Sequence, residues 1–109
     1  MITDNYANVP LSLRRHEHVA VITPALKTIW VDKGIARILS ALWASGIETI
    51  YSCEGDVSER GYIYFASSDD LDAFRRRMVG STAEYLTDSA EPIIRFNPTA
   101  LKSMTRHLF

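Results

Sequence analysis

Residues 32–46 read DKGIARILSALWASG, and this stretch carries the clearest helical pattern in the chain. Asp32 is a candidate N-cap, because a carboxylate accepts backbone N–H groups that the first turn of a helix leaves without partners. Four apolar residues then recur at helical spacing and define one stripe: Ile35, Ile38, Leu39 and Leu42. Gly46 supplies the left-handed residue that commonly ends a helix. The pattern therefore predicts a helix over 33–45.

Segments rich in β-branched and aromatic residues lie on both sides of this helix. They predict four strands, over 18–23, 47–52, 62–66 and 91–96. A second helix is expected to open at the capping box of Ser67 and Asp70 and to close at Gly80. A third is expected to open at Asn97 and Pro98, an N-cap followed by proline at the first helical position. This order predicts an α+β, ferredoxin-like βαββαβ fold with an extra C-terminal helix, in which an antiparallel sheet carries its helices on one face.

The length and composition fit one domain with one core. The chain has 109 residues, of which 47% are hydrophobic and 23% charged, as in an average globular protein. Residues 1–17 show no periodicity and are expected to form an irregular arm, whereas 18–109 are expected to form a single α+β domain. Residues 27–30 are interpreted as a connection that packs on the core, and 82–87 as one further helical turn.

Charge and cysteine content limit the environment and the partners. Twelve Lys and Arg against 13 Asp and Glu give a net charge of −1, so the chain has no global positive field for nonspecific nucleic-acid binding. Cys53 is the single cysteine, which fits a reducing compartment. There is no signal-peptide pattern and no apolar run near the roughly 20 residues that span a bilayer. We therefore expect a cytoplasmic protein that does not associate with a membrane.

The most distinctive local feature is the turn Ser52, Cys53, Glu54 and Gly55, which follows a predicted strand. Glycine can adopt positive φ there, and the turn would expose backbone N–H groups at a strand end, where ligands are often held. We treat these four residues as a candidate ligand-binding site. A nucleophilic Cys53 would need a cationic neighbour to stabilise its thiolate, but the acids Glu54 and Asp56 would raise its pKa. Packing of Cys53 as a small apolar residue is the preferred interpretation.

Residues 46–55 (GIETIYSCEG) and 62–65 (YIYF) together carry a resemblance. They resemble small uncharacterised phage and prophage proteins that pair a Gly-Ile-x-Thr-x-x-Ser-Cys-Glu-Gly turn with a Tyr-Ile-x-Phe strand. The resemblance covers about residues 31–66. It implies a phage-encoded protein acting in the host cytoplasm, and it implies no particular activity.

A second candidate site combines aromatic and basic residues. Tyr62 and Tyr64 would share one face of a strand, where they could stack on bases as sheet aromatics do in ferredoxin-like RNA-binding domains. Arg95, Lys102 and Arg106 would supply positive charge if the C-terminal helix lay beside them. The octapeptide pattern of RNA-recognition domains is absent, so a solvated basic face is the preferred interpretation.

No metal or cofactor is expected. His16 and His18 are two positions apart, but a structural zinc site needs four ligands at recognisable spacing, and there is no Cys-x-x-Cys or His-Glu-x-x-His. Nucleotide-binding loops and the Gly-x-Ser-x-Gly motif are also absent from the sequence. The sequence leaves open whether the protein is an enzyme.

These observations favour a small noncatalytic accessory protein that binds a protein or nucleotide partner, or a second copy of itself as a homodimer. An acidic loop between the second and third strands and a basic C-terminal segment would suit complementary association. Two alternatives stay open: a small-molecule-binding protein or enzyme that uses the Ser52–Gly55 turn, and a single-stranded RNA-binding module.

Overall fold

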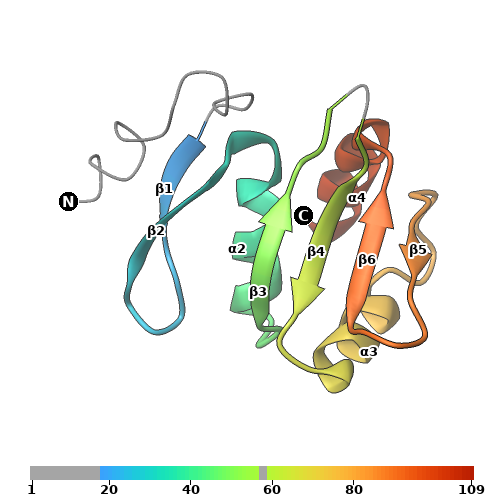
Figure 1. Ribbon diagram of the computed structural model, residues 1–109, viewed down its shortest axis with the longest axis horizontal. Coiled ribbons are helices and arrows are strands. Elements are labelled where there is room, and N and C mark those ends of the chain that lie inside the picture. Colours follow the sequence, from blue (N-terminus) through green and yellow to red (C-terminus); the bar gives the residue numbers. More distant parts are fainter. Residues whose placement is uncertain (1–17, 57–58) are drawn as a thin grey trace.

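The computed structural model describes residues 18–56 and 59–109, which form an α+β fold with two antiparallel sheets (Figure 1). The α+β class and the antiparallel pairing are therefore confirmed. The arm expected over 1–17 lies outside the described residues.

The first sheet is a hairpin of β1 (His18–Ile22) and β2 (Thr28–Asp32), paired so that Val19 lies opposite Val31. The prediction that 27–30 only connect the first strand to the helix is wrong. Their β-branched and aromatic residues favour extended backbone, and a short turn brings them back onto β1 at little cost in loop entropy. The backbone N–H of Thr23 donates to the carbonyl of Lys27 in that turn, at 2.8 Å.

The second sheet has four strands in the order β3-β4-β6-β5. Their bounds are β3 Thr49–Cys53, β4 Gly61–Phe65, β5 Leu86–Thr87 and β6 Ile93–Phe96. The pairing of β3 with β4 contains a bulge, in which Ile50 is the extra residue between Thr49 and Tyr51. Residues 82–87 do not form the expected helical turn, because the last two of them pair with β6.

The strand order differs from the expected ferredoxin-like order. That topology would place the first strand between the third and the fourth, which correspond to β4 and β6. In the structure β4 and β6 pair directly, with Ile63 opposite Ile94, and β1 pairs with β2 instead. The hairpin partner is close in sequence, so β1 gains its ladder without a crossover connection.

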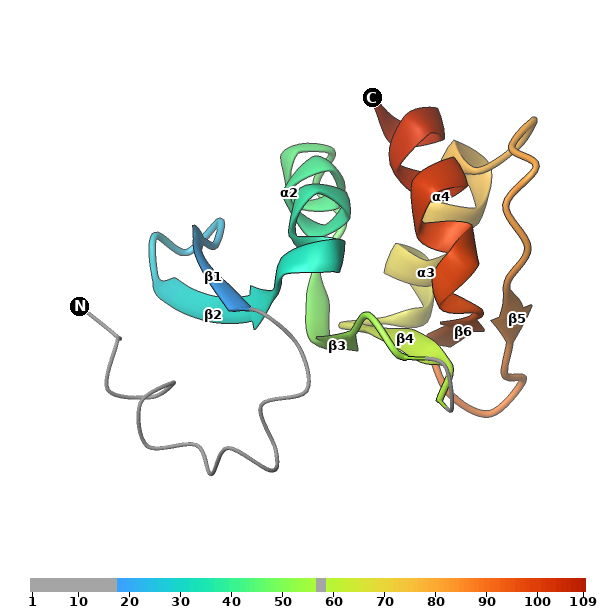
Figure 2. The same ribbon diagram turned by 90° about the horizontal axis from the view of Figure 1, so that it is seen from above.

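All three α-helices of the described part lie on one face of the four-stranded sheet, as expected (Figure 2). They are α2 (Ala36–Ala44), α3 (Ser68–Arg77) and α4 (Leu101–Leu108), and short 3-10 turns at Lys33–Ile35 and Pro98–Ala100 precede α2 and α4. Phe65 and Phe74 pack together in the core between sheet and helices, with ring centroids 5.3 Å apart.

Two of the three predicted caps are confirmed. The Ser67 hydroxyl accepts the N–H of Asp70 at 3.1 Å, and the Asn97 side chain accepts the N–H of Thr99 at 3.1 Å. The third is wrong, since Asp32 makes no capping hydrogen bond with its side chain. Its carboxylate is directed to other parts of the fold.

Candidate functional site

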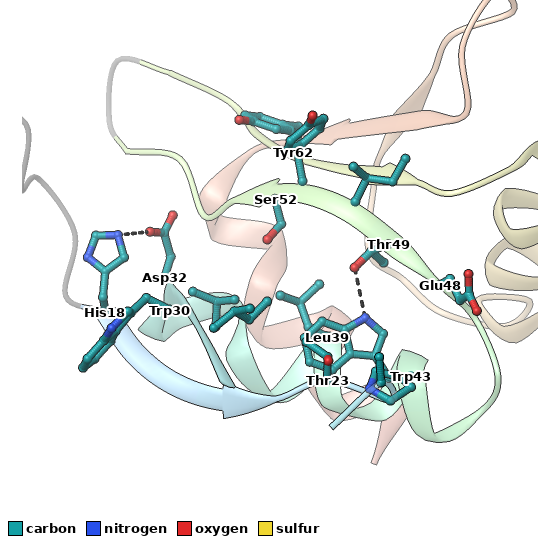
Figure 3. Close-up of a pocket in the computed structure, with 16 residues that line it drawn as sticks. His18, Thr23, Trp30, Asp32, Leu39, Trp43, Glu48, Thr49, Ser52 and Tyr62 are labelled. Carbon is teal, nitrogen blue, oxygen red and sulfur yellow. Dashed lines mark hydrogen bonds and ion pairs between the residues drawn. The ribbon is translucent and has the colours of Figure 1, made fainter. Parts of the chain in front are cut away.

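A cleft of about 480 Å³ separates the β1–β2 hairpin from β3 (Figure 3). Helix α2 runs between β2 and β3 in the chain and contributes Leu39 and Trp43 to the lining. The indole N–H of Trp43 donates to the hydroxyl of Thr49 at 3.0 Å, which ties the ring to the first residue of β3. The cleft is of the size that ligand sites usually have.

The lining of the cleft follows two strands residue by residue. Consecutive positions 29–32 of the hairpin and 48–52 at β3 all line it. Side chains of a strand alternate between its two faces, so a surface that touches consecutive residues runs along the strand's edge. β3 is the edge strand of its sheet in the described part of the chain. The cleft is therefore a slot beside the backbone of β3.

Asp32 lies where the hairpin meets the turn that follows β3. It is 7% exposed, and its Oδ1 lies 3.0 Å from Nε2 of His18. Its Oδ2 accepts the backbone N–H of Glu54 at 2.9 Å. A buried carboxylate is costly unless such donors surround it. Asp32 thus clamps the hairpin to the four-stranded sheet at this end of the cleft.

The expected ligand-binding turn is placed beside this clamp, but only Ser52 of its four residues lines the cleft. The carboxyl group of Glu54 packs directly against Gly34, so that a Cβ on residue 34 would overlap this carboxyl group. Gly55 is buried at φ +77°, and a Cβ on it would collide with the backbone of Gly61. Most of the turn is therefore packed against protein.

The environment of Cys53 favours the neutral thiol. Burial raises its pKa above the ordinary 9.0, and the nearby Asp32 raises it further, both by its charge and by accepting a hydrogen bond, while the backbone N–H of Gly55 acts in the opposite direction. Tyr62, which lies opposite Cys53 in the ladder, also has a raised pKa, through burial first and then through the charges of Cys53 and Asp32. A negative potential therefore reaches this end of the cleft.

The second candidate site is only partly assembled. Tyr62 and Arg95 are opposite each other in the ladder, and Tyr64 lies on the same face of the sheet as Tyr62, away from the helices. Lys102 and Arg106 belong to α4, which covers the other face (Figure 2). The five residues therefore do not form one patch.

Acidic neighbours further weaken an anion-binding interpretation of this face. The pKa of Tyr64 is raised, first by burial and then by the charge and hydrogen bonding of Glu91. Oδ2 of Asp88 lies 3.8 Å from Nη1 of Arg95, so the positive charge of Arg95 already has an acidic neighbour.

Sequence reasoning missed three contributors to the cleft: β2, the Trp43 ring and the role of Asp32. The β-rich residues of β2 could have been recognised by their composition. Trp43 follows the buried Leu39 by one helical turn, a spacing that could have placed its ring beside the apolar stripe of α2, where it lines the cleft. Asp32 carried no pattern that would distinguish a clamp from a cap.

Neither a metal centre nor a membrane span is found in the described part of the chain. No group of three or more His, Cys, Asp or Glu side chains in residues 18–56 and 59–109 is arranged to hold a metal ion. Within the same residues, every helix is too short or too polar to cross a bilayer. Comparisons with protein-family models, curated proteins and solved structures found no match.

Proposed function

We propose that this protein is a noncatalytic binding protein whose cleft receives an extended segment of a partner protein, added as a new strand at the edge of β3. The observation that carries the proposal is the continuous lining of the cleft by residues 48–52, because side chains of a strand alternate between its faces and a surface that touches consecutive residues of an edge strand lies beside its backbone. Addition of a strand to an exposed sheet edge is a recurrent mode of peptide recognition.

The surroundings of this edge suit an extended chain. A bound strand would direct alternate side chains to opposite faces, one set toward Leu39 and Trp43 on α2, the other toward Tyr62 on the open face of the sheet. β2 would flank the new strand on its other side, away from the end where Asp32 holds the hairpin against the turn after β3. The cleft would thus offer an extended chain both a slot of fitting shape and the backbone groups along the edge of β3. A compact small molecule would use only part of these contacts.

The residues of β3 include no Pro and no Lys or other charged side chain that would oppose pairing, and its one protective irregularity is the bulge at Ile50. Natural edge strands carry Lys, Pro or inward-pointing charges. β3 reads TIYSC, and its Ile50 and Tyr51 are 52% and 64% exposed. Ile29 of β2, which also lines the cleft, is exposed as well. Apolar residues left open beside a strand edge indicate an interaction surface.

The chemistry of the neighbouring thiol supports a binding role over a nucleophilic one. A nucleophilic cysteine needs a lowered pKa, whereas burial and Asp32 raise that of Cys53. The proposal requires no covalent step.

The test uses a randomised octapeptide library, selected on the full-length protein, followed by hydrogen exchange of the complex. We expect selected peptides to slow exchange of β3 amides. Ile50→Lys should weaken their binding at least about tenfold, since a charged edge opposes strand pairing. Val79→Lys is the matched control, because Val79 is an apolar side chain 76% exposed on the segment after α3, outside the cleft lining.

Three results would overturn the proposal. The first is a selection that yields no binding peptide. The second is protection confined to elements other than β3. The third is equal weakening by Ile50→Lys and Val79→Lys. A dimer in sedimentation that dissociates with Ile50→Lys would show that a second copy of the chain, and not a foreign segment, occupies the edge.

A further inference from the structure

The charged side chains among the described residues that line the cleft are mostly acidic. Asp32 and Glu48 contribute carboxylates, and His18 is paired with the first of them. Among the described residues, no Lys or Arg lines the cleft. A segment that enters it meets Asp32, the clamp, whose oxygens are engaged by His18 and Glu54, and Glu48, an exposed carboxylate just before β3.

The burial of Asp32 strengthens this field. A charge at 7% exposure is screened less than one in water, so its influence extends along the cleft wall. The raised pKa values of Cys53 and Tyr62 agree with this, because the charge of Asp32 contributes to both.

Four aromatic residues of the described part of the chain line the same cleft, from the hairpin, from α2 and from the four-stranded sheet. They are Trp30, Trp43, Tyr51 and Tyr62. The hydrogen bond from Trp43 to Thr49 ties one of these rings to β3 (Figure 3). The faces of such rings attract cations, and more strongly where water is excluded. Carboxylates and aromatic rings in one slot are complementary to an ammonium or guanidinium group.

We infer that the strand bound in the cleft carries a Lys or Arg in the set of side chains that faces Trp43 of α2, so that its charged group meets an aromatic ring within the acidic lining of the cleft. This inference rests on the proposed function and adds the chemical class of the side chain recognised. The hydrocarbon stem of a basic residue would pack on the rings while its charged end meets a carboxylate.

The experiment uses blocked peptides from the selected pool in which one basic residue is replaced by norleucine, which keeps the stem and removes the charge. We expect the pool to be enriched in Lys or Arg at one position. Replacement there should weaken binding about tenfold, and added salt should reduce the difference. Calorimetric titration of the full-length protein measures both.

A protein variant locates the effect. Glu48 is exposed, so Glu48→Gln should preserve the fold, weaken the basic peptide about threefold and leave the norleucine peptide unchanged. Glu84→Gln, an exposed acid outside the cleft lining, is the control and should change neither.

The two proposals fail in different ways. A norleucine peptide that binds as tightly as the basic one, with β3 still protected from exchange, would refute the basic side chain and leave strand addition standing. A pool with no binding peptide would refute both.

Discussion

Removing the Asp32 carboxylate should release the β1–β2 hairpin from the four-stranded sheet. The carboxylate accepts hydrogen bonds from the His18 ring at 3.0 Å and from the Glu54 backbone at 2.9 Å, and it joins residues 22 positions apart. Hydrogen bonds to a charged group contribute about 1.5–3 kcal/mol each. The cost of burying the charge offsets part of this sum. We therefore expect Asp32→Ala to lower the free energy of unfolding by about 3 kcal/mol.

Urea denaturation followed by circular dichroism measures this loss. Asp72→Ala, which removes an exposed acid from α3, should stay within about 0.5 kcal/mol of the parent. A double-mutant cycle of Asp32→Ala with His18→Ala should show a coupling of about 1–2 kcal/mol. Hydrogen exchange should accelerate in β1 and β2 more than in β4 and β6. A loss below about 1 kcal/mol, or a coupling near zero, would refute the clamp.

Three further predictions concern single residues. The thiol of Cys53 should be alkylated with a pH midpoint above 9.0, because burial raises its pKa; a midpoint at or below that value would contradict the environment described. Because the pKa of Cys53 is higher in the folded than in the unfolded state, the neutral thiol contributes fully to stability below the unfolded-state pKa, and this contribution is lost as pH rises through the folded-state pKa. Cys53→Ala should therefore reduce the loss of folding stability at alkaline pH. Gly55→Ala should cost about 2 kcal/mol or more in urea denaturation, because its Cβ would meet the Gly61 backbone at positive φ; Gly46→Ala, also at positive φ but in open space, should cost about 1 kcal/mol, and equal losses would contradict the steric argument. Leu26 is 85% exposed and has a left-handed backbone with φ 60°, which is costly for a residue with a Cβ but not for glycine. Leu26→Gly should therefore raise the free energy of unfolding, measured by thermal denaturation, by up to about 1 kcal/mol, and a marked loss would indicate that the leucine side chain has a structural partner.

Helices were the part of the fold most accessible to sequence reasoning. The apolar stripe of α2 is buried as its spacing predicted, at Ile38, Leu39 and Leu42. The capping pair of Ser67 and Asp70 marks the start of α3. These features depend on residues three or four positions apart, whose contacts form within one element.

The pairing of strands was less accessible. Strand composition placed β3, β4 and β6 close to their observed positions, yet the partner of β1 was wrong. An extended segment shows its own periodicity but not which edge it will pair with. The choice is made by loop entropy and by the packing of whole elements.

The sequence by itself determined the α+β class, the three amphipathic helices and the places of β3, β4 and β6, because periodicity and capping are local properties. Only the tertiary structure decided that β1 pairs with β2, that Asp32 clamps the hairpin and that a cleft lies beside β3. The clamp and the cleft each join residues far apart in the chain, whereas the hairpin pairs near neighbours, and its preference over another strand edge is set by the fold as a whole. The hydrogen bond from the backbone of Glu54 to Asp32 exists only after two sheets have come together around α2, and no pattern along the sequence records it.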